Sequence, residues 1–135
     1  MCFWELRLCH DNPVINRSCY FENALSTLAI DVPGATDKPG TALIQYTHNN
    51  RFNQRFNIYR KGIDFVIENL HSKLYLTIKG NSSQPGAQIV QSKISNKEGQ
   101  RWKIEYQGKN LYFIRSVLKN ELLLGIQDNS FKIET

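Results

Sequence analysis

Residues 21–58 have the sequence FENALSTLAIDVPGATDKPGTALIQYTHNNRFNQRFNI, and residues 67–104 have the sequence IENLHSKLYLTIKGNSSQPGAQIVQSKISNKEGQRWKI. The two stretches align without a gap at one constant offset. The matched positions include Ser26/Ser72, Leu28/Leu74, Ile30/Leu76, Gly34/Gly80, Gly40/Gly86, Gln45/Gln91, Gln54/Gln100 and Phe56/Trp102. A repeat of this length indicates a fold built from copies of one supersecondary unit. The function is therefore expected where the copies differ.

Length and composition predict one globular domain with a real core. The chain has 135 residues, of which 41% are hydrophobic and 21% charged. Its net charge is +5, which invites a nucleic-acid interpretation. The basic residues are scattered, however, and the densest groups are only Arg60-Lys61 and Arg101/Lys103. We therefore expect no nucleic-acid partner.

The three cysteines all precede the repeats. Cys2, Cys9 and Cys19 make an odd number, which argues against a full disulfide framework, and the sequence leaves open whether Cys9 and Cys19 pair. Their spacing is not that of a zinc site, so no metal or cofactor is expected. The first residues lack the features of a signal peptide, and no run is long enough to span a membrane. We expect a chain that is not membrane-embedded, and that is cytoplasmic, exported by another route or cut from a precursor.

Apolar and polar residues alternate along short segments, which predicts β-strands. Examples are Leu74–Ile78, Ile89–Gln91 and Trp102–Tyr106. Turn signals such as Pro33-Gly34 and Gln84-Pro85-Gly86 separate these segments. No window favours a long helix. The predicted fold class is all-β, a sandwich or a closed barrel.

A third, shorter copy follows the second. Ile114–Val117 parallels Ile67–Leu70, and Leu122–Ile126 parallels Leu74–Ile78, but the last strand is missing. We expect the N-terminal segment Phe3–Arg7, which resembles residues 100–104, to complete this unit and close the structure. The expected parts of a single domain 1–135 are an N-terminal strand at about 2–8 and units at about 18–60, 64–106 and 110–135.

The two complete copies resemble the repeat of ricin B-chain type lectin domains. The first contains Asn23-x-x-Ser26, Leu28-x-Ile30-Asp31-Val32, Gly40-Thr41, Ile44-Gln45-Tyr46 and Asn53-Gln54-x-Phe56. The composition and the short third unit are also similar to trefoil components of clostridial haemagglutinin complexes. The resemblance implies a β-trefoil with pseudo-threefold symmetry, and a lectin. Phe56 stands where the family has Trp, and the third copy lacks the Gln-x-Trp motif.

The core of such a trefoil is expected to use the matched apolar positions. These are Leu28/Leu74, Ile30/Leu76, Val32/Ile78, Leu43/Ile89, Phe56/Trp102 and Ile58/Ile104. Gln54 and Gln100 lie beside the core aromatics Phe56 and Trp102, and all four are expected to be structural. A buried amide must find partners, so both glutamines should bind backbone groups in the turns.

The first copy carries a set of side chains suited to a sugar. The resemblance implies that Asp31, Tyr46 and Asn53 bind carbohydrate. A carboxylate accepts bonds from neighbouring hydroxyls, an aromatic face packs on C–H groups, and an amide completes the set. His48 and Asn49 follow on the same loop, and Gln45 is a secondary candidate because it should point opposite to Tyr46.

The second copy has lost this set while keeping its core positions. Thr77, Ser92 and Gly99 replace Asp31, Tyr46 and Asn53, and the third copy has Gly125 at the Asp31 position. The contrast predicts one sugar site, in the first copy, with galactose or N-acetylgalactosamine favoured by the resemblance alone. A single shallow site binds weakly, so a homo-oligomer or a larger complex is expected to supply avidity.

One other interpretation remains open at this point. In it, Asp31 is a turn residue, Tyr46 an exposed aromatic and Asn53 a cap. The chain is then a protein-interaction trefoil: a complex adaptor, a toxin-subunit module or a protease-inhibitor-like domain. Convergence of the three side chains on one concave spot would favour the lectin. No partner carboxylate for Asp31 is evident, so we expect no enzyme. We also expect Asp31→Ala to abolish glycan binding with little change in thermal stability.

Overall fold

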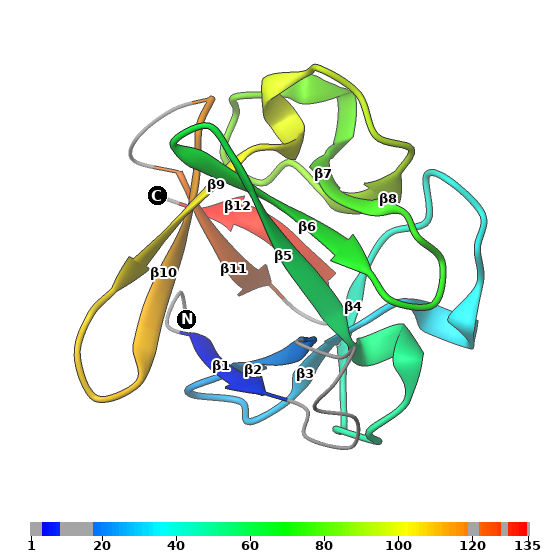
Figure 1. The fold of residues 1–135 in the computed structure, drawn as a ribbon, viewed down its shortest axis with the longest axis vertical. Helices are drawn as coiled ribbons and strands as arrows, with labels where there is room; N and C mark the ends of the chain where they lie inside the picture. Colours follow the sequence, from blue (N-terminus) through cyan, green and yellow to red (C-terminus); the bar gives the residue numbers. More distant parts are fainter. Residues whose placement is uncertain (1–3, 9–17, 119–121, 128–129, 135) are drawn as a thin grey trace.

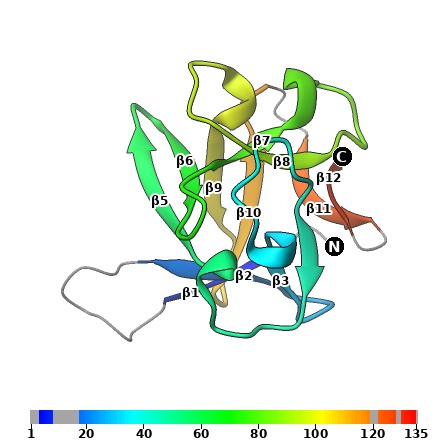
Figure 2. The ribbon, with the colours of Figure 1, turned by 90° about the vertical axis from the view of Figure 1, so that its right-hand side faces the viewer.

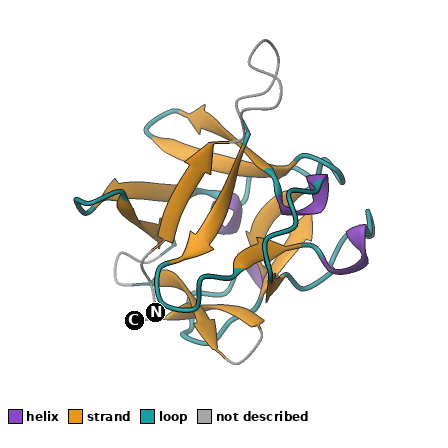
Figure 3. Ribbon diagram, turned by 90° about the horizontal axis from the view of Figure 1, so that it is seen from below, coloured by secondary structure: helices purple, strands orange, loops and turns teal. Residues whose placement is uncertain are grey.

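The computed structural model describes residues 4–8, 18–118, 122–127 and 130–134, and these residues form twelve β-strands and four short 3₁₀ turns. The strands are β1 (Trp4–Leu8), β2 (Cys19–Asn23), β3 (Ala29–Asp31), β4 (Ile44–Tyr46), β5 (Phe56–Lys61), β6 (Asp64–Asn69), β7 (Tyr75–Ile78), β8 (Ile89–Ser92), β9 (Trp102–Tyr106), β10 (Leu111–Ser116), β11 (Leu123–Gln127) and β12 (Ser130–Glu134). The turns are η1 (Pro33–Ala35), η2 (Phe52–Gln54), η3 (Lys79–Asn81) and η4 (Glu98–Gln100). They lie in connections between strands (Figure 3).

Six strands close into a barrel. β1 pairs with β2, β2 with β5, β5 with β6, β6 with β9, β9 with β10, and β10 returns to β1, always antiparallel. The remaining strands form the hairpins β3–β4, β7–β8 and β11–β12, which meet through β12–β4 and a bridge from Ala42 to Val90 (Figure 1). Closure leaves no free edge on the barrel. The predicted β-trefoil is confirmed.

The N-terminal strand completes the third unit, as predicted. β5 pairs with the first strand of its own unit and that of the next, and β9 does the same; Figure 2 shows the β5–β6 hairpin beside β9 and β10. β1 holds the equivalent place between β10 and β2. The Trp4 indole Nε1 donates to the Leu124 carbonyl at 3.2 Å, and the Trp102 indole Nε1 donates to the Leu76 carbonyl at 3.2 Å. Trp4 is therefore the aromatic residue that the third copy lacks in sequence.

The core is continuous through the three units. It consists of Trp4, Cys19, Phe21, Ile30, Val32, Leu43, Phe56, Ile67, Leu76, Ile78, Ile89, Trp102, Ile114, Leu122 and Leu124. Burying each large side chain stabilises the fold by roughly 1.5–3 kcal/mol. Ile58 and Ile104 are partly buried and pack against this cluster. Leu28 departs from expectation: it is only half-buried, although the equivalent Leu74 is buried.

Several sequence expectations concern the N-terminal segment and the membrane. Cys2 and Cys9 lie outside the described residues, and so does any Cys9–Cys19 pairing, while Cys19 is buried. Within the described ranges, no helix has the length and apolar character needed to cross a membrane. The same ranges hold no cluster of three His, Cys, Asp or Glu side chains suited to a metal ion.

Candidate functional site

The first repeat contains a pocket of about 400 Å³ between β3, β4, η1 and η2. Its polar and apolar walls come from Asp31, Ile44, Tyr46, Asn49, Arg51 and Asn53, together with the η1 turn. The structure thus brings Asp31, Tyr46 and Asn53 to one concave spot, although 22 residues separate Asp31 from Asn53 in the chain. Asn49, named from its place on the loop, also lines the pocket.

Strand register explains which side chains share this face. Asp31 pairs with Ile44 and Ala29 pairs with Tyr46, so Asp31, Ile44 and Tyr46 lie on one face of the β3–β4 hairpin. Gln45 pairs with Ile30 on the opposite face and does not line the pocket. Tyr46 is 57% exposed, which leaves its ring available to a ligand.

The Asp31 carboxylate forms the buried floor of the pocket. Asp31 is only 4% exposed. Its Oδ2 accepts hydrogen bonds from Gln54 Nε2 at 2.7 Å and from Asn53 Nδ2 at 3.3 Å. Its Oδ1 accepts no hydrogen bond from any described residue, so one carboxylate oxygen is left for a ligand. Burial raises the pKa of Asp31 above its ordinary value, and the two amide bonds offset this rise only in part.

The η2 turn orients the other polar groups. Asn53 Nδ2 also donates to the Val32 carbonyl at 3.1 Å, so its donors point inward and its Oδ1 remains as an acceptor. Asn49 Oδ1 accepts from the Arg51 backbone N–H at 2.9 Å, which leaves the Asn49 amide nitrogen as a donor. The pocket therefore offers acceptors at its floor and donors at its rim.

Gln54 ties the floor of the pocket to the loop above it. Its Nε2 donates to the Thr47 carbonyl at 3.0 Å as well as to Asp31, and its Oε1 accepts from the Asn49 backbone N–H at 2.9 Å. Gln54 is fully buried. This one amide holds β3 and the 47–49 segment in a fixed relation.

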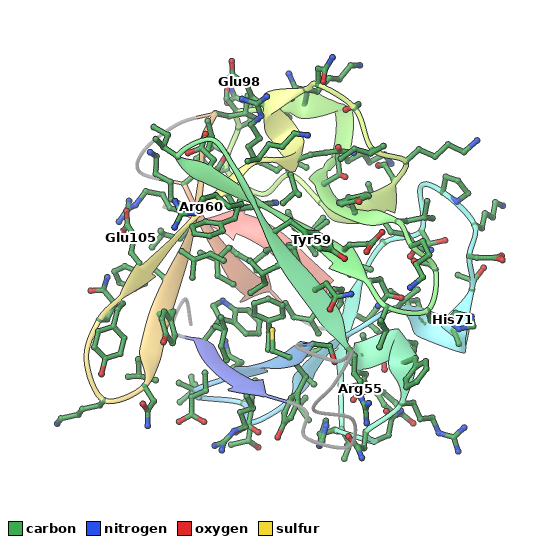
Figure 4. All side chains as sticks on the ribbon, viewed as in Figure 1. Arg55, Tyr59, Arg60, His71, Glu98 and Glu105 are labelled. Carbon is green, nitrogen blue, oxygen red and sulfur yellow. The ribbon has the colours of Figure 1, made fainter. Side chains whose placement is uncertain are left out.

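Arg51 is a pocket residue that sequence comparison missed. It lies on the loop two positions after Asn49, and only its location on the pocket wall singles it out. The neighbouring Arg55 is buried beneath η2 (Figure 4). The Arg55 guanidinium donates to the carbonyl and side-chain oxygens of Asn50 at 3.0 and 2.7 Å and lies 5.2 Å from the Phe52 ring centre. These contacts brace the loop that carries Arg51.

His48, a candidate because of its place on the same loop, does not line the pocket. Its ring stacks on Tyr20 of β2, with ring centres 3.7 Å apart and planes inclined by 13°. Burial lowers the pKa of His48. This stack holds the His48 ring against β2 and away from the pocket.

The second repeat shows what Asp31 does for the fold. There, Gln100 Nε2 donates to the Lys93 carbonyl at 2.6 Å and to Thr77 Oγ1 at 3.2 Å, and Gln100 Oε1 accepts from Ser95 N at 2.9 Å. Thr77 thus replaces the Asp31 carboxylate as an acceptor for the glutamine. Asp31 therefore has a structural contact of its own, and the expectation that Asp31→Ala leaves stability almost unchanged does not follow from this geometry.

Comparison with known proteins places the chain in a family. The model of the ricin-type beta-trefoil lectin domain-like family matches residues 4–91 and 52–133. The chain belongs to this family. No curated protein matches it in sequence. Membership supports a carbohydrate-binding module in general terms.

Solved structures share the trefoil at low sequence identity. The designed threefold-symmetric protein ThreeFoil has a TM-score of 0.75 and 19% identity over 99% of this chain and 88% of its own. The Rhizoctonia solani agglutinin has a TM-score of 0.72 and 15% identity, covering 98% of this chain and 82% of its own. An exo-beta-1,3-galactanase from Clostridium thermocellum has a TM-score of 0.75 and 17% identity, covering 100% of this chain. This trefoil corresponds to only 27% of the galactanase chain. At these identities the likeness shows the fold alone.

Proposed function

We propose that this family member is a carbohydrate-binding module whose sugar site is the first-repeat pocket. The observation that carries the proposal is the convergence of Asp31, Tyr46 and Asn53 on one pocket, with Asp31 Oδ1 left without a protein donor among the described residues. This convergence favours a lectin over a protein-interaction trefoil, for which the three side chains have no reason to meet.

The pocket chemistry suits a galactose-type ring. Two adjacent sugar hydroxyls donate to Asp31 Oδ1 and Asn53 Oδ1, and the Asn49 amide and the Arg51 guanidinium donate to the ring's own oxygens. The Tyr46 ring packs on the C–H groups of one sugar face. Galactose and N-acetylgalactosamine present such a face opposite their axial 4-hydroxyl, which supports them as the ligands.

The module acts by binding rather than by catalysis. Asp31 is the only carboxylate among the described residues that line the pocket. Glycoside hydrolysis ordinarily needs two carboxyl groups flanking the bond, so the pocket lacks the second. A single shallow site of this size gives a dissociation constant on the order of a millimolar, about −4 kcal/mol. Several copies in an oligomer or a larger complex would raise the avidity.

A glycan array followed by calorimetric titration tests the proposal. We expect galactose-terminated or N-acetylgalactosamine-terminated glycans to bind the wild-type chain, and Tyr46→Ala to lose that binding while keeping the fold. An array that stays blank on a folded chain, or binding that survives Tyr46→Ala, would contradict the proposed site.

A further inference from the structure

The second repeat keeps a pocket although it has lost the sugar-binding set. This second-repeat pocket has a volume of about 470 Å³ and occupies the place equivalent to the first-repeat pocket. Its walls include Thr77, Asn81, Ser92, Lys93, Ile94 and Lys97. Because the side chains of this pocket differ from those of the first repeat, its ligand must be inferred from its own chemistry.

The charge of the wall is different in the two pockets. The first-repeat pocket is lined by one anionic residue, Asp31, and one cationic residue, Arg51. In the second-repeat pocket the charged groups are both cations, Lys93 and Lys97, and Thr77 occupies the carboxylate position. Neither lysine forms an ion pair with a described residue. Glu98 does not line this pocket and lies at the outer edge of η4 (Figure 4).

The second-repeat pocket has a polar floor made of different residues from those in the first repeat. Asn81 Oδ1 accepts a hydrogen bond from the Gly99 backbone N–H at 2.7 Å. A Cβ on Gly99 would lie 2.7 Å from that same Asn81 oxygen, closer than side-chain carbons approach. In the first repeat the asparagine is on the other of the two segments. Asn53 stands at the position of Gly99, and Ala35 stands at the position of Asn81. The exchange leaves the Asn81 amide nitrogen as a donor.

The remaining wall combines hydroxyl groups with an apolar surface. The Thr77 hydroxyl is held between the Tyr75 carbonyl, to which it donates at 2.7 Å, and Gln100, from which it accepts. Ser92 is half-buried on the wall, and Ile94 is 52% exposed, which provides an apolar surface for one face of a sugar ring.

We propose that the second-repeat pocket binds an anionic sugar, one that carries a carboxylate or a sulfate group. Lys93 and Lys97 pair with the anionic group, Ser92 and Asn81 bind ring hydroxyls, and Ile94 packs on the ring. The chain then has two sites of different chemistry, a neutral-sugar site in the first repeat and an acidic-sugar site in the second. The proposal extends the proposed function to a new pocket and does not require the first site to bind.

Site-resolved NMR titration tests this proposal independently of the first site. The full chain carrying Asp31→Thr is titrated with sialyllactose, with sulfated lactose and with lactose, and the amide shifts of residues 92–97 are followed. The double variant Lys93→Gln/Lys97→Gln removes both cations. Lys61→Gln/Lys73→Gln removes two exposed lysines elsewhere and is the matched control for net charge.

We expect one or both acidic sugars to shift residues 92–97, with lactose at least about tenfold weaker. The response should weaken as salt is added, because exposed charges are screened. It should be lost in Lys93→Gln/Lys97→Gln and kept in the control. A shift with sialyllactose indicates a carboxylate ligand, and a shift with sulfated lactose indicates a sulfate ligand. No shift with either acidic sugar, equal shifts with lactose, or equal shifts with inorganic sulfate alone would overturn the proposal.

Discussion

Replacing Asp31 with threonine separates the structural role of this residue from its proposed role in binding. The second repeat already has threonine at this position. Thr77 occupies the place equivalent to Asp31 and accepts a hydrogen bond from Gln100. Asp31→Thr should therefore keep an acceptor for Gln54 and remove the carboxylate. Asp31→Ala removes both.

The structure sets the expected magnitudes. Asp31→Ala deprives the buried amides of Gln54 and Asn53 of an acceptor, at a cost of about 1–3 kcal/mol. For a chain of this length that lowers the melting temperature by roughly 3–10 °C. Asp31→Thr should stay within about 1 kcal/mol of the wild type. Both variants should weaken binding of the neutral sugar at least about tenfold, because a charge-assisted hydrogen bond contributes about 1.5–3 kcal/mol.

Thermal unfolding followed by circular dichroism, together with calorimetric titration of the best array ligand, measures both effects. Asp37→Thr is the matched control, since Asp37 is an exposed carboxylate of the same repeat that does not line the pocket. A wild-type affinity in Asp31→Thr would refute the role of the carboxylate in binding. A fall in melting temperature as large as that of Asp31→Ala would refute the structural equivalence of Asp31 and Thr77.

Three further predictions concern the core, the aromatic wall and pH. Trp4→Ala should destabilise the fold by about 3–5 kcal/mol in chemical denaturation, because it empties a fully buried site in the closing strand. Tyr46→Ala should weaken sugar binding in calorimetry and leave the melting temperature within about 2 °C, because the ring is largely exposed. The raised pKa of Asp31 means that protonation of this carboxyl favours the folded state. This protonation-linked stabilisation is fully present below the unfolded-state pKa of about 3.9 and is lost as pH rises through the folded-state value. Sugar affinity should follow the opposite course and fall on acidification at a higher pH than for an ordinary aspartate; titrations between pH 7 and pH 4 would contradict this if affinity stayed flat.

The threefold architecture was predictable from sequence because it rests on positions that recur along the chain. Leu76 and Ile30 occupy matched places in the repeat and are both buried in the core, and Gln54 and Gln100 make matching contacts. A recurring apolar pattern must be buried in a recurring way, so the fold followed from it. The proposed sugar-binding residues Asp31, Tyr46 and Asn53 were likewise visible as the polar set present in one copy and missing from the next.

Only the tertiary structure decided how these groups are used. Strand alternation already predicted that Gln45 points away from Tyr46, but the stack of His48 on Tyr20 and the position of Arg51 on the pocket wall were not visible in the sequence. Barrel closure placed Trp4 in the position that the third copy lacked. Each of these outcomes depends on contacts between residues far apart in the chain. A repeat pattern specifies which positions are buried, but hydrogen-bond partners and loop directions depend on how the buried units meet.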